Sequence, residues 1–236
     1  MATSGSTNYE ADRNAVIKGA LRIVGAIAQG QSPSTDQYTE AAEALNMLVK
    51  ALQTDGMPLW AIKINNFALT NATATYRIGL SQTINTPKPL KILQAFLRNT
   101  TSNVDTPLQI ITKHEYWELG NKTTTGLPIQ LMYDPQNLYG DLYLYPTPDS
   151  TAETSYEVYI IYHRPFEDFD SATDTPDFPQ EWHLALKFGL AEQLAPEYGV
   201  SLEQYGFIAK KAKEYRMEAL SFGTEEGSLF FSIERR

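Results

Sequence analysis

The chain of 236 residues contains no cysteine. Disulfide bonds, thiolate catalysis and cysteine-ligated zinc are therefore excluded. Positive charge is also scarce, because 19 lysines and arginines stand against 28 acidic residues and leave a net charge of −9. This balance argues against a protein that coats nucleic acid over its whole surface.

Signals for membrane insertion, secretion and catalysis are missing as well. No apolar run approaches the ~20 residues that cross a bilayer. The small polar residues of Met1–Thr7 lack the charged and apolar parts of a signal peptide. The motifs GxxxxGKS/T, GxGxxG, GxSxG and HExxH are absent. We therefore expect no membrane contact, no enzyme activity, no cofactor and no metal site.

Two groups of polar residues could in principle carry chemistry. The histidines stand far apart in the sequence, beside aromatic or arginine neighbours, which favours structural roles; they are His114, His163 and His183. The carboxylates that could serve a hydrolase as acid and base are Glu115 with Glu118 and Glu181 with Glu192. Nothing in the sequence shows that either pair converges.

A third group has the spacing of a calcium loop. Asp168, Asp170 and Asp174 match positions 1, 3 and 7 of an EF-hand. That loop also needs glycine at position 6 and glutamate at position 12, where this chain has Thr173 and Pro179. An EF-hand is thus excluded, and a solvated acidic loop is favoured over a looser cation site.

Both ends of the chain have the periodicity of amphipathic helices. Apolar residues recur three and four positions apart through residues 16–28, 38–52, 182–193 and 202–219. Capping boxes predict three helix starts, at Thr7–Glu10, Ser34–Gln37 and Ser201–Gln204. Gly30 is the predicted end of the first helix.

The middle of the chain has the pattern of β-strands. Six short segments are rich in β-branched and aromatic residues and are separated by Pro, Gly, Asn and Asp. They span residues 74–78, 90–97, 108–112, 129–133, 140–145 and 156–162. A helical turn is predicted at residues 113–119. An antiparallel sandwich or small barrel would close such a set of strands.

Neither helical end can bury its apolar stripe alone, so we expect the two ends to pair. The predicted fold class is α+β. A four-helix bundle is built from N- and C-terminal helical hairpins, residues 8–56 and 178–222, with an antiparallel β module, residues 59–165, inserted between them. Residues 166–177 form an acidic connector, and residues 223–236 form an extended C-terminal arm.

The arm is apolar and aromatic and ends in two arginines. Its candidate partner-binding residues are Leu229, Phe230, Phe231, Ile233, Arg235 and Arg236. Burial of each large apolar side chain is worth roughly 1.5–3 kcal/mol, so the arm should contact a protein surface. Either it folds back on its own domain, or it docks on a neighbouring subunit or another protein through its phenylalanines and arginines.

A basic row occupies the last predicted helix. Lys210, Lys213 and Arg216 recur every three residues, with Lys211 beside them and glutamates on the same helix. One interpretation is a solvated face with local ion pairs. The other is a surface that meets phosphates in a channel or an acidic partner.

Several strings in this chain resemble those of structural proteins from tailed phages. They are MATSGSTN at residues 1–8, EYW at 115–117, DFDSATDTPDFPQEW at 168–182 and LAPEYG at 194–199. On these strings, and over nearly the whole chain, the sequence resembles the head-to-tail adaptor (connector or tail accessory factor) family of short-tailed bacteriophages. None of the strings is a catalytic motif.

The resemblance implies a homo-oligomeric ring, usually of twelve copies, under the portal protein at the capsid vertex. Such a ring extends the DNA channel, helps to retain the packaged genome and offers a platform to the downstream tail or nozzle protein. Double-stranded DNA would pass through the lumen without its sequence being read, and an acidic lumen would keep it from sticking. The implied location is the tail or neck of the virion, after assembly in the host cytoplasm.

Family members also reach the portal with a C-terminal arm, which corresponds here to residues 229–236. The large β module departs from the smaller, mainly helical adaptors. Two alternatives to an adaptor stay open: a distal neck or tail-tube protein that does not touch the portal, and a cell-wall or glycan hydrolase.

Overall fold

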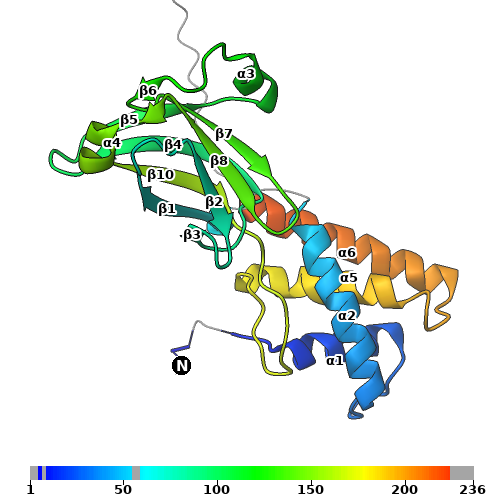
Figure 1. Ribbon diagram of the computed structural model, residues 1–236. Coiled ribbons are helices and arrows are strands. Elements are labelled where there is room, and N and C mark those ends of the chain that lie inside the picture. The colour runs from blue at the N-terminus through cyan, green and yellow to red at the C-terminus, as the bar shows by residue number, and fades with distance from the viewer. Residues whose placement is uncertain (1–4, 7–8, 55–58, 224–236) are drawn as a thin grey trace, which may run out of the picture. The chain divides into compact units, whose positions relative to one another are not determined.

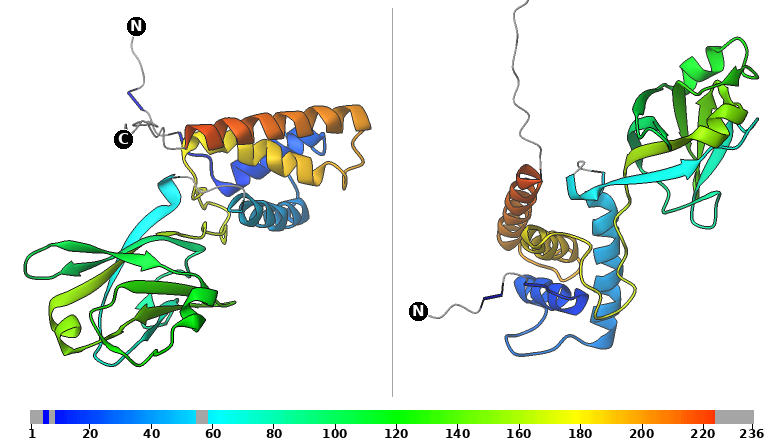
Figure 2. Two further views of the ribbon diagram at one scale, coloured as in Figure 1. Left: turned by 90° about the horizontal axis from the view of Figure 1, so that it is seen from above. Right: turned by 90° about the vertical axis from the view of Figure 1, so that its left-hand side faces the viewer.

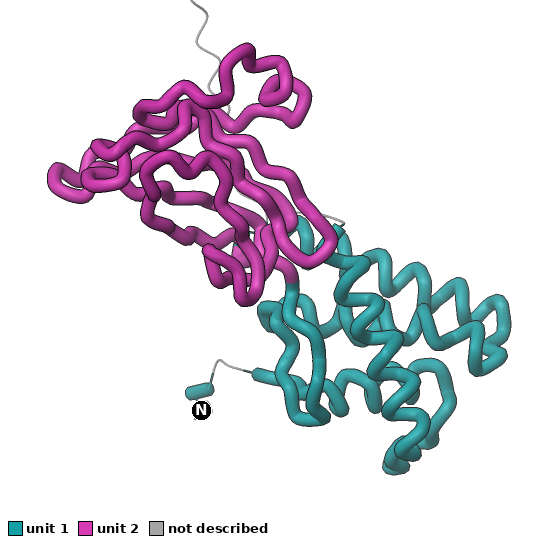
Figure 3. Tube along the Cα trace, in the orientation of Figure 1, with its two compact units in different colours: residues 1–59, 166–236 teal, residues 60–165 magenta. Residues whose placement is uncertain are grey.

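The computed structural model describes residues 5–6, 9–54 and 59–223. The chain divides into two compact units, which Figure 3 shows in different colours. The helical unit comprises residues 1–59 and 166–236, and the β unit comprises residues 60–165. The β unit is thus an insertion between the two halves of the helical unit.

The helical unit contains four long helices from both ends of the chain. They are α1 (Arg13–Val24), α2 (Thr35–Leu52), α5 (His183–Leu194) and α6 (Leu202–Phe222), and the 3₁₀ turn η2 (Gln180–Trp182) precedes α5.

The ends of these helices follow from local capping chemistry. Ser34 and Gln37 form the predicted capping box of α2, so that prediction is confirmed. Ser201 caps the predicted start of α6 by accepting a hydrogen bond from the Gln204 N–H, but the Gln204 side chain donates to the Ile23 carbonyl and does not complete a capping box. The predicted start of α1 at Thr7 is wrong. Asp12 caps this helix by accepting a hydrogen bond of 2.7 Å from the Ala15 N–H, and α1 ends at Gly25, whose φ of 83° suits glycine, rather than at Gly30.

The prediction of a four-helix bundle is wrong. Helices in such a bundle lie within about 20° of (anti)parallel, whereas the right-hand view of Figure 2 shows α2 along its length and α5 nearly end-on, so α2 runs across α5. The centre of the unit is α5, which packs against each of the other three helices. Gly189 lets α2 approach closely, because a Cβ atom there would lie 3.1 Å from Leu48 Cδ2.

The predicted acidic connector is a structured strap on the helical unit. Its main chain exchanges two hydrogen bonds with the Asn46 side chain, at 2.9 and 3.2 Å, both to Phe169. The side chains of Phe166 and Phe169 are buried, and Lys50 pairs with Asp168. Buried aromatic side chains therefore anchor this segment, while the acidic residues Glu167, Asp168 and Asp170 are exposed, as expected of a solvated acidic loop.

The β unit begins with the 3₁₀ turn η1 (Leu59–Ala61) and contains ten strands and two short helices in the described part of the chain (Figure 1). The strands are β1 (Ile62–Ala68), β2 (Thr75–Gly79), β3 (Ile84–Asn85), β4 (Lys91–Asn99), β5 (Asp105–Ile110), β6 (Thr125–Gly126), β7 (Gln130–Pro135), β8 (Gly140–Tyr145), β9 (Thr147–Pro148) and β10 (Tyr156–His163). The helices are α3 (Lys113–Glu118) and α4 (Ser150–Ser155).

All six predicted strands and the helical turn at α3 are present, but the prediction of an antiparallel module is wrong. Eight strands form one mixed sheet in the order β1-β10-β4-β5-β7-β8-β2-β3, and β6 pairs with β9 apart from it. The pairs β5–β7 and β2–β3 are parallel. The connection from β5 to β7 carries α3 and β6, and a crossover of that length permits parallel pairing.

The sheet curls until it is nearly closed, because its inner face forms one core (Figure 1). Every one of the eight strands contributes a side chain to this buried cluster, from Phe67 on β1 to Ile84 on β3. Ala152 of α4 joins it. The complete architecture is therefore a mixed α and β protein with a large curled sheet and a helical unit centred on α5.

Gly140 should be intolerant of any side chain. A Cβ atom there would lie 2.3 Å from Tyr133 Cε2, and the Tyr133 hydroxyl donates a hydrogen bond of 2.6 Å to the Pro89 carbonyl. We expect Gly140→Ala to lower the free energy of unfolding by about 1–3 kcal/mol, measured by urea denaturation, because the partly buried ring, which packs against the core, must shift. Gly120→Ala is the control, since no atom lies within 4 Å of its Cβ position; equal effects of the two changes would contradict the packing argument.

Candidate functional site

Helix α6 is unusually exposed for its length. It has 21 residues, of which only Ile208, Ala212 and Ala219 are buried. Several of its large apolar side chains face solvent, among them Phe207 and Met217, each 59% exposed. A helix normally buries a wide apolar stripe, so α6 has much more free surface than its own unit requires.

The predicted basic row lines a groove along this helix. Lys210, Lys213 and Arg216 form its α6 side, together with Ala209 and Ala212, and the groove has a volume of about 480 Å³. Leu48 and Leu52 of α2 and Gly189 of α5 form the apolar part of the wall. The structure thus brings together all three residues of the row and places them beside an apolar surface.

Local ion pairs account for only part of this positive charge. Lys211 lies 2.7 Å from Glu214, and this hydrogen bond raises the pKa of Lys211 and lowers the pKa of Glu214. Lys210 lies 3.9 Å from the same carboxylate, and its side chain is 74% exposed. Within the described residues, Lys213 has no acidic partner, although Glu192 lines the same groove. The glutamates of α6 therefore neutralise only part of the positive charge of the row.

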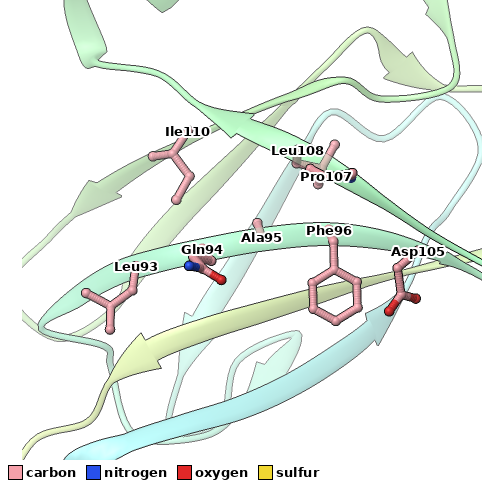
Figure 4. Close-up of a pocket in the computed structure, with 8 residues that line it drawn as sticks. All are labelled: Leu93, Gln94, Ala95, Phe96, Asp105, Pro107, Leu108 and Ile110. Carbon is pink, nitrogen blue, oxygen red and sulfur yellow. The ribbon is translucent and has the colours of Figure 1, made fainter. Parts of the chain in front are cut away.

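The β unit has an apolar notch that the sequence pattern did not indicate (Figure 4). Strands β4 and β5 pair only from Ala95–Leu108 to Arg98–Asp105, while β4 runs back to Lys91 and β5 runs on to Ile110. Where the strands separate, side chains of Leu93, Phe96, Pro107 and Ile110 help to line a notch of about 380 Å³. Separation of two strands can be seen only when their register is known.

A rigid cluster of side chains borders this notch. The rings of Phe96 and Tyr159 stack 5.1 Å apart, and the Arg98 guanidinium lies 4.5 Å from the Tyr159 ring centre. Arg98 also donates two hydrogen bonds of 2.7 Å to Asp105, which lowers the pKa of that carboxyl group. Cross-strand pairs of this kind stabilise a sheet, so this outer face is well ordered for a protein contact.

The candidate catalytic carboxylates have local partners or lie far apart. Glu115 accepts hydrogen bonds from the Thr112 N–H and hydroxyl at 2.6 and 2.8 Å, which lowers its pKa. It caps α3, and Glu118 lies 3.2 Å from His114. Glu181 and Glu192 stand at opposite ends of α5, about 16 Å apart along the axis, well beyond the 5–9.5 Å that glycosidases use.

The other polar candidates have structural surroundings. Asp174 accepts main-chain hydrogen bonds from Asp170 and Ser171 at 2.8 and 2.6 Å, so it shapes the strap. His163 and His183 both have lowered pKa values because they are desolvated. Within the residues that the structure describes, no three His, Asp or Glu side chains are placed to hold a metal ion.

Two further observations concern the rest of the chain. The arm residues Leu229, Phe230, Phe231, Ile233, Arg235 and Arg236 lie outside the described residues. Among the helices that are described, none is long and apolar enough to span a bilayer.

A comparison with protein families gives the decisive observation. The model of the SU10 adaptor protein family matches residues 16–219, which include α2, α5, the whole β unit and most of α1 and α6. The chain belongs to the SU10 adaptor protein family. A search of curated proteins found no significant match.

Family membership indicates the general role of the chain. An SU10 adaptor is a structural component of a phage particle that contacts other head or tail proteins. The exposed helix α6, its basic groove and the notch between β4 and β5 are the described surfaces suited to such contacts.

His183 should make the stability of the adaptor depend on pH. Its Nδ1 atom is buried without a hydrogen-bond partner among the described residues, and burial lowers its pKa below the usual 6.5. The unfolded chain therefore binds a proton at His183 near pH 6.5, whereas the folded chain binds it only at a lower pH. The free energy of unfolding consequently decreases as the pH falls from 6.5 toward the lower pKa of His183 in the folded state.

The test compares urea denaturation of the wild type and His183→Gln at pH 7.5 and at pH 5.5. We expect the wild type to lose more unfolding free energy between the two pH values than the variant does. Equal losses would show that another group causes the pH dependence.

Proposed function

We propose that this protein is a head-to-tail adaptor of the virion neck. Copies of the chain form a ring of twelve subunits that docks on the portal protein and receives the next tail or nozzle protein. The observation that carries this proposal is the family match over residues 16–219, which spans both units rather than one. It is supported by exposed surfaces on each unit.

In this function the ring continues the DNA channel and helps to retain the packaged genome. The net charge of −9 supports a lumen that lets DNA pass without holding it. We propose that the particle assembles in the host cytoplasm.

The C-terminal arm, residues 225–236, is the proposed contact with the portal. Its sequence offers Phe230 and Phe231 as aromatic anchors and Arg235 and Arg236 as partners for carboxylates. The helices of the unit are capped and packed without these residues. Removal of the arm should therefore affect docking more than folding.

The adaptor function can be tested by light scattering. The purified chain is measured alone and mixed with the portal ring of the same virus. We expect a complex of defined mass in the mixture, because many weak contacts around one axis act together. If the chain does not bind the portal ring, the result would contradict the adaptor function and favour a more distal neck or tail-tube protein.

The role of the arm is tested by deletion of residues 225–236. We expect portal binding to weaken by at least about a hundredfold, the effect of losing two aromatic anchors, while the thermal unfolding temperature stays the same. Phe230→Ala with Phe231→Ala is the matched point variant and should reproduce most of the loss. Full binding by the deleted chain would place the portal contact elsewhere.

A further inference from the structure

Two helices of the helical unit present exposed stripes of opposite charge. On α2 the stripe consists of Asp36, Glu40, Glu43 and Met47, and all four side chains are exposed. On α6 the stripe consists of Gly206, Lys210, Lys213 and Met217, and all four residues are exposed as well. We name these the acidic stripe and the basic stripe.

Each stripe lies opposite the buried face of its own helix. The buried residues Ala41, Leu45 and Leu52 of α2 are on the far side from the acidic stripe at 100° per residue. The buried residues of α6 also lie on the far side of their helix from the basic stripe; they are Ile208, Ala212 and Ala219. Neither stripe can therefore reach the other within one helical unit, so each is available to a different molecule.

The two stripes have the same spacing. Residues 36, 40, 43 and 47 are separated by four, three and four positions, and so are residues 206, 210, 213 and 217. Two helices that lie side by side in parallel would bring Glu40 to Lys210, Glu43 to Lys213 and Met47 to Met217. Asp36 would then face Gly206, where an added Cβ atom would meet nothing within 4 Å.

The charges match without strong competition from within the chain. Among the described residues, neither Glu40 nor Glu43 forms an ion pair, and Lys213 has none either. Met47 and Met217 are 67% and 59% exposed and lie at the same end of the two stripes. Exposed ion pairs contribute little affinity but set the register, and the methionines supply apolar contact.

We propose that the acidic stripe on α2 of one copy binds the basic stripe on α6 of the next copy. This inference rests on the proposed ring and identifies the contact between its subunits. Because the two surfaces differ, the contact is head-to-tail, and repetition of it generates a closed ring when the rotation per subunit divides the circle. In this arrangement the basic stripe contacts a neighbouring subunit rather than DNA.

Charge reversal tests the proposal. Lys210→Glu with Lys213→Glu, and separately Glu40→Lys with Glu43→Lys, should each weaken self-association by about tenfold or more, since like charges then oppose each other. Lys63→Glu with Lys91→Glu is the control, because it changes net charge as much as the first variant does at exposed strand positions. It should leave self-association unchanged.

Mixing the two reversed variants in equal amounts is the sharper experiment. Each then meets a complementary stripe on the other, so light scattering should show the wild-type mass again, alone or on the portal ring. Recovery supports the proposal. Failure to recover, unchanged self-association of the single variants, or a wild type that never self-associates even on the portal would overturn it.

The absence of cysteine permits a direct test of the register. A chain with Met47→Cys and Met217→Cys should form disulfide-linked multimers on mild oxidation, whereas each single variant should stop at dimers at most. The pair Met47→Cys and Gly206→Cys tests the antiparallel arrangement, which would also align the charges; preferential cross-linking there would overturn the parallel register. Portal binding is assayed separately, so loss of this contact is distinguished from loss of the adaptor function.

Discussion

The central position of α5 is the constraint on which the helical unit depends. This helix is apolar on several sides, with Ala185, Leu186, Leu190 and Leu194 buried, so it needs neighbours in more than one direction. Those neighbours are α1 and α2 from the N-terminal part of the chain and α6 from the C-terminal part. The unit can form only when both ends of the chain meet, which leaves the β unit as an insertion.

Packing around one central helix also leaves surface free. In a four-helix bundle each helix is covered by two neighbours, but here α2 and α6 use one face on α5 and expose the other. The outward faces have opposite charge, acidic on α2 and basic on α6. The chain belongs to a family of phage adaptors, and the proposed contact between subunits uses these outward faces.

The sheet of the β unit is nearly closed but has an apolar notch between β4 and β5. All eight strands share one core, yet β4 and β5 separate beyond Ala95 and Leu108. The notch at this point is apolar and is bordered by the Arg98–Asp105 pair and the stacked rings of Phe96 and Tyr159. A nearly closed sheet thus keeps one well-ordered place where a partner could bind.

The sequence by itself determined the local structure, because capping and periodicity act within a few residues. Ser34 and Ser201 begin their helices as predicted, and the six predicted strands exist. Asp12 was missed because Thr7–Glu10 also fits a capping box. Strand β1 has no regular alternation of buried and exposed residues, and β3 has only two residues. The basic row of Lys210, Lys213 and Arg216 could be recognised in the sequence, but the groove that it lines could not.

Only the tertiary structure decided that α2 crosses its neighbours, that β5 and β7 run parallel and that β4 and β5 separate. Crossing angle and register depend on which distant side chains pack together.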